Sequence, residues 1–146
     1  MDKLEYITGD LVYFESEKAK VEFCNPSADG FIWVRVIENG GENRIWNALL
    51  KNEISPIPLT KEILEKNGWK KEVMSRGTLN KHWIYTKPDI KEYGYFPIYI
   101  EKGIGKEFDV YPFTDNNVCT QIAYIKHVHQ LQHLLFGLGL NSEMEV

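Results

Sequence analysis

Cysteine is scarce in this sequence, and neither cysteine belongs to a recognisable motif. Cys24 and Cys119 are the two cysteines among 146 residues, and they lie far apart. They match neither a CxxC pair nor the spacing of a disulfide framework or a zinc site. We therefore expect two reduced, half-buried thiols, which is the usual state of cysteine in the cytosol.

Long apolar runs are also missing. No stretch approaches the ~20 apolar residues that a membrane helix needs. The first residues do not have the charged and apolar regions of a secretory signal peptide. The sequence therefore predicts a soluble protein of the cytoplasm with no membrane partner.

The motifs of common enzyme classes are absent as well. The sequence has no Gly-rich phosphate loop, no nucleophile elbow and no paired-carboxylate motif. The nearest candidate is Gly103-Ile104-Gly105-Lys106, which lacks the spacing of a phosphate loop and is typical of a hairpin turn. We therefore predict a protein that is not an enzyme and that holds no cofactor.

Aromatic residues, in contrast, are plentiful, with four Trp, eight Tyr and seven Phe. A chain of this length can bury on the order of 70% of its unfolded surface, so we expect one domain or two small lobes that share a core. The net charge is −4, but residues 59–105 hold nine basic and six acidic side chains, a net charge of +3. Overall acidity makes nucleic acid a poor default ligand, whereas a local basic patch can still bind it.

Residues 1–55 have the pattern of short strands joined by tight turns. Turn-forming residues are densest at 25–30 and 38–42. The strands are expected at Leu11–Phe14, Lys20–Cys24, Phe31–Ile37 and Arg44–Asn47. This arrangement predicts a β-rich, SH3-like lobe over residues 1–55. Its expected interior side chains are Val21, Phe23, Ile32, Val34, Val36 and Ile45.

Pro56 and Pro58 mark a boundary, and residues 56–146 have the pattern of an α+β lobe. Thr60 is expected to cap a short helix that Gly68 ends, and a second helix is expected over 126–138. Five strands are predicted between them: Trp69–Val73, Lys81–Lys87, Phe96–Lys102, Glu107–Phe113 and Val118–Ile125. The predicted fold class is α+β, with an antiparallel sheet and two flanking helices behind the SH3-like lobe. One continuous domain is the alternative to two lobes.

Two segments of the sequence carry a resemblance to other proteins. They are the PIPLT stretch with its helix, at Pro56–Trp69, and the HQLQ helix, at Val128–Phe136. In this order they resemble a family of small uncharacterised proteins of Bacteroides-type bacteria and of their phages and mobile elements. The resemblance covers roughly residues 53–70 and 120–140 and is looser elsewhere. It implies a bacterial host as the setting and no particular activity, because that family has none assigned.

Two histidines of the last predicted helix invite a metal interpretation. His129 and His133 are four residues apart, a spacing that lets two imidazoles share one ion. No Glu lies between them as in the helix of zinc proteases, and the sequence fixes no third ligand. Both histidines lie on the helix face opposite the leucines, so we expect imidazoles at the surface or at an interface, and no metal.

The same helix face carries a second stripe that is a candidate binding surface. It consists of His129, His133, Phe136 and Leu140, which step by four, three and four residues. One apolar face is enough to dock a helix on a sheet, so the second face could contact a partner protein, a second copy of the chain or the N-terminal lobe. Tyr13 and Glu15 are further candidates, because an acidic and aromatic patch can dock on a basic protein surface.

A stretch that mixes basic and aromatic residues, over 66–91, supports nucleic acid as the alternative ligand. Aromatic faces stack on unpaired bases and lysines neutralise phosphates. The same composition also describes a solvated sheet face with an aromatic core side. The candidate nucleic-acid-binding residues are Trp69, Lys70, Lys71, Arg76, Lys81, Trp83 and Lys87.

These features favour a non-enzymatic, protein-binding protein of a phage or mobile element. Its sharpest form is an anti-defence inhibitor that binds a host immune nuclease, such as a CRISPR effector or its guide-RNA complex. The alternative is an accessory module that binds RNA or single-stranded nucleic acid through residues 66–91. An enzyme that uses histidine or cysteine chemistry is the least favoured class.

Overall fold

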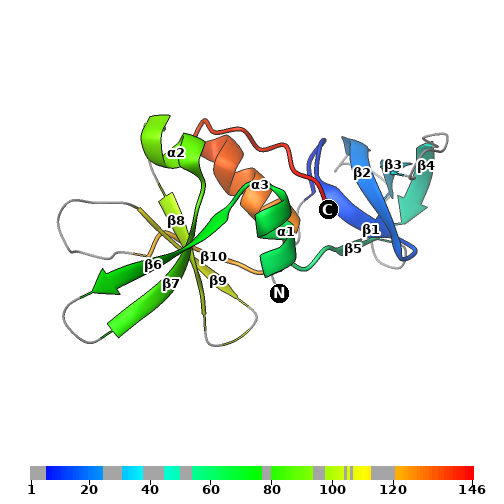
Figure 1. Cartoon of the computed structure of the whole chain (residues 1–146). Coiled ribbons are helices and arrows are strands. Elements are labelled where there is room, and N and C mark those ends of the chain that lie inside the picture. The colour runs from blue at the N-terminus through cyan, green and yellow to red at the C-terminus, as the bar shows by residue number, and fades with distance from the viewer. Residues whose placement is uncertain are drawn as a thin grey trace.

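The computed structural model describes residues 6–24, 31–37, 45–49, 54–76, 80–93, 98–103, 105, 107–112 and 121–146. Within these residues the chain forms a β-rich α+β fold, with two five-stranded antiparallel sheets and three helices. The helices α1 and α3 lie between the two sheets (Figure 1). None of the described helices has the length and apolar character that a membrane span needs.

The N-terminal sheet has the strand order β4-β3-β2-β1-β5. Its strands are β1 (Leu11–Phe14), β2 (Glu17–Cys24), β3 (Phe31–Val36), β4 (Ile45–Leu49) and β5 (Ile54–Pro56). β1 is an interior strand, because Val12 lies opposite Ala19 of β2 on one side and Pro56 of β5 on the other. From the sequence, only a boundary was predicted at Pro56. In the structure Pro56 is the last residue of the edge strand β5, where a missing N–H is tolerated.

β1 and β2 are joined by a turn of two residues, Glu15 and Ser16. Phe14 and Glu17 are opposite each other in the ladder, and the turn residues have φ angles of 46° and 71°. Two consecutive positive φ angles are typical of a type I′ hairpin turn, which matches the twist of the flanking strands. Glu15 is therefore an exposed residue in a left-handed conformation that glycine or asparagine would adopt more easily.

The interior of the N-terminal sheet follows the alternation of its strands. Val21, Val34 and Val36 are buried as predicted, and the described part of 11–47 contains no helix. The side chains of the other three residues predicted inside, Phe23, Ile32 and Ile45, lie outside what the structure describes. The buried cluster comprises Tyr6, Val12, Phe14, Ala19, Val21, Val34, Val36 and Ile54.

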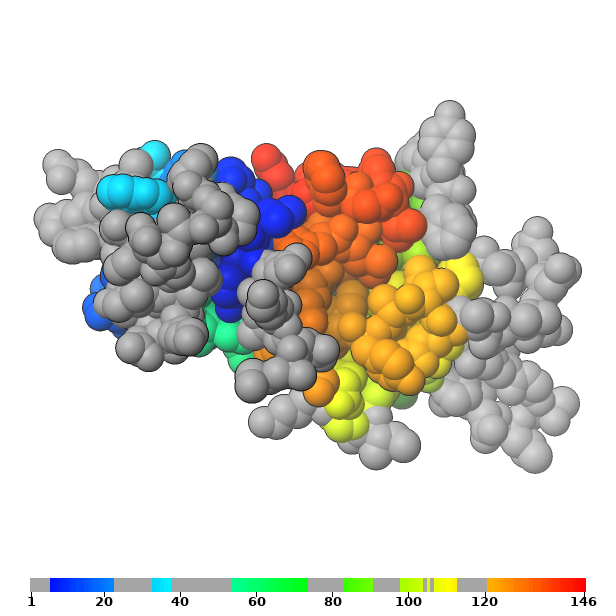
Figure 2. Space-filling model, turned by 180° about the vertical axis from the view of Figure 1, so that it is seen from behind, coloured from blue at the N-terminus to red at the C-terminus, as the bar shows by residue number. Residues whose placement is uncertain are grey.

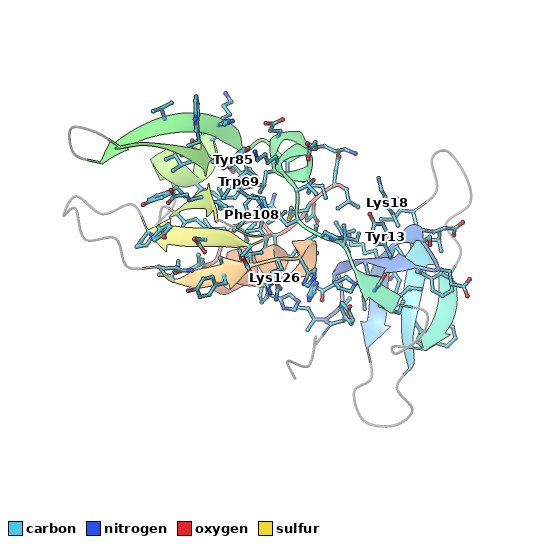
Figure 3. All side chains as sticks on the ribbon, turned by 90° about the horizontal axis from the view of Figure 1, so that it is seen from below. Tyr13, Lys18, Trp69, Tyr85, Phe108 and Lys126 are labelled. Carbon is cyan, nitrogen blue, oxygen red and sulfur yellow. The ribbon has the colours of Figure 1, made fainter. Side chains whose placement is uncertain are left out.

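The C-terminal sheet has the strand order β10-β9-β8-β7-β6. Its strands are β6 (Lys70–Arg76), β7 (Asn80–Thr86), β8 (Ile98–Lys102), β9 (Phe108–Pro112) and β10 (Ala123–Ile125). Each strand lies within or overlaps a range predicted from the sequence. Trp69, Tyr85 and Phe108 are buried on this side of the molecule, whereas Tyr13 and Lys18 belong to the other sheet (Figure 3).

The helices are α1 (Lys61–Lys66), α2 (Pro88–Tyr93) and α3 (Val128–Gly137). The Thr60 hydroxyl caps α1 by accepting the N–H of Ile63 at 3.2 Å, and Gly68, with a φ of +87°, follows its end as predicted. α2 was missed, because no helix was predicted between the strand ranges Lys81–Lys87 and Phe96–Lys102. A proline at the first position of a helix is favoured, since its absent N–H would have no partner there.

β1 takes part in both hydrophobic cores because its side chains alternate between two faces. Val12 and Phe14 belong to the N-terminal cluster, whereas Leu11 belongs to the C-terminal cluster and Tyr13 packs against it. The C-terminal cluster comprises Leu11, Ile57, Leu59, Leu64, Trp69, Tyr85, Ile90, Ile98, Ile100, Phe108, Val110, Ile125, Val128, Leu131 and Leu135. The N-terminal sheet therefore packs on α3 through β1.

The leucine face of α3 should dominate the stability of the fold. Leu131 is fully buried and Leu135 is nearly so, so Leu131→Ala or Leu135→Ala should lower the free energy of unfolding by about 2–5 kcal/mol. Phe136→Ala on the same helix is the control, because that ring is 71% exposed. Urea unfolding measures all three. Equal effects of Leu131→Ala and Phe136→Ala would mean that the helix is turned differently.

Candidate functional site

The face of α3 that meets the N-terminal lobe is organised around the carboxamide of Gln132. Its Oε1 atom accepts the N–H of Leu11 at 2.9 Å, and its Nε2 atom donates to the carbonyl of Gly9 at 3.1 Å. The side chain is only 6% exposed, so these bonds are largely shielded from water. They hold the start of β1 against α3, and Figure 2 shows the blue N-terminal residues lying against the orange helix.

An acid–histidine pair lies beside this contact. The Nε2 atom of His133 lies 2.8 and 2.9 Å from the two carboxylate oxygens of Asp10, and the carboxylate also accepts the N–H of Ile7 at 2.8 Å. Asp10 is nearly buried, and burial raises the pKa of its carboxyl, although the bonds from Ile7 and His133 oppose the rise. The pair therefore fixes the loop before β1 to α3.

A cluster of aromatic rings extends from this pair along α3. The ring of His129 lies 5.0 Å from Tyr6, 5.8 Å from His127 and 5.6 Å from His133, measured between centroids. Burial, together with the neighbouring His133 and His127, lowers the pKa of His129 to about 4. Burial likewise raises the pKa of Tyr6 to about 12, helped by the charge of Asp10. His129 and Tyr6 are therefore both neutral at pH 7.

Of the two placements expected for His129 and His133, surface or interface, the structure shows the interface. His129 is 2% exposed, and the side chain of His133, which is hydrogen-bonded to Asp10, is 32% exposed. The sequence pattern correctly separated two faces of α3. It did not indicate that the N-terminal lobe covers the second face, which was one of the alternatives left open.

A hollow of about 280 Å³ opens at the junction of the two lobes, next to the Asp10–His133 pair. We call it the junction hollow. Two large apolar side chains on its lining remain exposed, Phe136 by 71% and Ile7 by 45%. Its lining residues are Ile7, Thr8, Gly9, Asp10, Leu11, Lys20, Gln132, His133, Phe136, Ser142, Glu143 and Met144.

The remaining candidates for protein binding are more dispersed. Leu140 is half-buried and packs against the C-terminal core rather than extending an exposed stripe. Tyr13 is half-buried on the face of β1 that points to the same core, and Glu15 is exposed at the β1–β2 turn. Of the four residues of the predicted stripe, Phe136 alone is exposed.

The basic and aromatic stretch is only partly available at the surface. Trp69 is buried, and Lys87 is mostly covered and lies 4.0 Å from Asp89. Lys70 and Lys71 are exposed on β6, and the ammonium of Lys71 lies 4.6 Å from the centre of the Trp83 ring, which is 56% exposed. The side chains of the two other candidates, Arg76 and Lys81, lie outside the described part of the structure.

The structure adds residues that the sequence did not single out as a site. Asp10 and Gln132 are polar, buried and joined to partners more than 120 residues away. No local pattern signals such long-range pairing. Among the residues that the structure describes, no three His, Cys, Asp or Glu side chains are grouped as metal ligands would be.

Comparison with known proteins gives no match: no protein-family model, curated protein or solved structure is significantly similar to this chain. The resemblance of Pro56–Trp69 and Val128–Phe136 to a bacterial and phage family therefore stays a prediction.

Burial of neutral His129 should make the fold sensitive to acid. The unfolded histidine gains a proton near pH 6.5 and the folded one only near pH 4, so stability is lost as the pH falls through this window. Once the pH is below both pKa values, the free energy of unfolding should have fallen by roughly 2–4 kcal/mol because of His129. Urea unfolding at pH 7 and pH 4.5 should show a smaller pH dependence for His129→Gln than for the parent. An unchanged pH dependence would contradict this assignment.

Proposed function

We propose that this chain is a non-enzymatic, protein-binding protein that docks its partner at the junction hollow. The observation that carries the proposal is the exposure of Phe136 and Ile7 on a hollow whose lining is otherwise mostly polar. Large aromatic side chains that flank a concave surface are typical anchors of protein interfaces. Phe136 is 71% exposed and contributes little buried area to the fold, so its ring is free to enter a pocket of the partner.

The chemistry of the hollow favours binding over catalysis. Both oxygens of Asp10 bind the same nitrogen of His133, and one of them also accepts a main-chain N–H. Within the described residues, no hydroxyl or thiol is hydrogen-bonded to His133, as a nucleophile activated by this base would be. The pair therefore serves as a tie between the two lobes.

A phage or mobile-element origin and the cytoplasm of a bacterial host are part of the same proposal. They rest on the resemblance of Pro56–Trp69 and Val128–Phe136. The most specific version of this proposal is an anti-defence inhibitor of a host immune nuclease, such as a CRISPR effector or its guide-RNA complex. The net charge of −4 suits a partner with a basic channel, because complementary charge speeds association and selects partners.

We also infer an SH3-like relationship for the N-terminal lobe. The order β4-β3-β2-β1-β5 supports it, because neighbouring strands follow in sequence and the last strand pairs with the first. SH3-like lobes are small barrels that commonly serve as binding modules, which agrees with a binding function.

One observation favours nucleic acid as a second candidate ligand. Exposed Trp83 with Lys71 over its ring, together with exposed Val73 opposite Trp83, forms a small basic and aromatic surface on β6 and β7. Such a surface could stack a base and neutralise a phosphate. Burial of Trp69 reduces its extent, so we rank this function second.

The docking proposal predicts that Phe136 is an anchor. Once a partner has been captured from the bacterial host after nuclease treatment and purified, Phe136→Asp should weaken its binding by about 30-fold or more. Tyr124→Asp is the matched control, because Tyr124 is 69% exposed but lies on β10, outside the lining of the hollow. Isothermal titration calorimetry gives both affinities. Equal affinities for parent and Phe136→Asp would exclude the hollow as the docking site.

The second candidate is tested by charge reversal. Parent protein should bind short single-stranded RNA and DNA weakly or not at all, in line with its net acidity. Lys70→Glu/Lys71→Glu/Lys81→Glu should therefore change little in fluorescence anisotropy at low and moderate salt. Tight, salt-sensitive binding by the parent that collapses in this triple variant would place nucleic acid first, because each phosphate contact adds to the salt dependence.

A further inference from the structure

Residues 141–146 follow α3 and cross the boundary between the lobes without forming helix or strand (Figure 1). We call them the strap. Exposure alternates strictly along the strap: Asn141, Glu143 and Glu145 are exposed, whereas Ser142, Met144 and Val146 are half-buried. Met144 and Val146 pack against the C-terminal core. A period of two is typical of an extended chain that lies with one face on a surface.

The carboxamide of Asn67, at the end of α1, binds the main chain of the strap. Its Oδ1 atom accepts the N–H of Glu145 at 2.7 Å, and its Nδ2 atom donates to the carbonyl of Glu145 at 2.7 Å. Nδ2 also donates to the carbonyl of Ile63 at 2.8 Å, which fixes the orientation of the amide. Because both strap bonds go to main-chain atoms, the contact does not depend on which side chain residue 145 carries.

Two lysines from different lobes converge on the same segment. The ammonium groups of Lys18, from β2, and Lys66, from α1, lie 2.8 and 3.2 Å from the main-chain oxygen of Val146. The outward side chains of the strap, Glu143 and Glu145, are acidic. The two lysines contact the main chain of the strap and not its glutamates, so their positive charge favours an acidic segment through its field alone.

We propose that the seat of the strap is a peptide-binding groove, and that its ligand is a short segment of a partner protein with apolar side chains two residues apart and acidic residues beside them. The proposal rests on the protein-binding function above and specifies the chemistry of the partner. Main-chain bonds supply affinity and alternate side chains supply specificity, as in other modes of extended-peptide recognition. The strap occupies the groove in cis and is displaced when the partner binds.

Displacement of the strap links the groove to the junction hollow. Ser142, Glu143 and Met144 form part of the lining of the hollow, which also includes Phe136. When the strap leaves, this side of the hollow opens and the two surfaces become one continuous binding face. The tethered strap competes for the groove at an effective concentration on the order of millimolar. A partner that binds both the groove and the hollow displaces the strap more readily than one that binds the groove alone.

A labelled peptide with the sequence of residues 139–146 tests the groove by fluorescence anisotropy with the full chain. Glu145→Pro removes the N–H that the strap donates to Asn67, so this variant should bind the peptide at least about tenfold more tightly than the parent. Adding Asn67→Leu should abolish that binding. Glu143→Pro is the matched control, because the Glu143 N–H bonds within the strap, to Asn141 at 3.1 Å. It should bind like the parent.

Peptide variants test the stated chemistry. Replacement of the Met or Val of the peptide by Asp should abolish binding, whereas replacement of either Glu by Lys should weaken it. If Glu145→Pro does not fold, as judged by circular dichroism, Met144→Ser/Val146→Ser replaces it. Failure of both folded strap variants to bind the peptide, or binding that Asn67→Leu leaves intact, would overturn the proposal.

The alternative occupant is a second copy of the chain that exchanges straps. Sedimentation velocity distinguishes it: a concentration-dependent dimer of the parent that Asn67→Leu dissociates would overturn the partner-segment proposal in favour of exchange. A monomeric parent supports it. Failure of the groove is separable from failure of the docking proposal, because partner binding that requires Phe136 would persist without any peptide binding at Asn67.

Discussion

The packing of α3 on both of its sides is the constraint on which the rest of the structure depends. Its leucines close the C-terminal core, and Gln132 on the other side satisfies main-chain groups of Leu11 and Gly9 in a buried setting. A buried main-chain N–H without a partner costs about 1–3 kcal/mol, so the contact fixes where the N-terminal sheet can sit. The junction hollow and the seat of the strap both depend on this placement.

The elements of the fold were largely predictable because their signals are local. Alternation in β2 and β3, the Thr60 cap and the glycine after α1 each act within a few residues. The edge strand β5 and the helix α2 were missed because proline has two meanings: it breaks regular structure in most places, but it is compatible with an edge strand and with a helix start.

The candidate site was less predictable because it is built from distant parts of the chain. Phe136 could be singled out as a residue off the leucine face of its helix. The role of His133 could not, because its partner Asp10 is 123 residues away. Trp69 shows the reverse case, in which a residue grouped by composition with surface lysines belongs to the core. Composition describes a segment, whereas function depends on which face each side chain occupies.

The double-sided docking of α3 also has a consequence for biosynthesis. Ribosomes make both sheets before α3, and the hydrogen bond between Leu11 and Gln132 spans 121 residues. Until α3 emerges, Leu11 and the part of the C-terminal core that Val128, Leu131 and Leu135 close lack this cover, although α1 and α2 already contribute Leu64 and Ile90. Uncovered apolar surface of this kind is prone to aggregation and attracts chaperones. The nascent chain therefore keeps this apolar surface exposed until late in translation. Docking of α3 then covers the C-terminal core and joins it to the N-terminal sheet in one step.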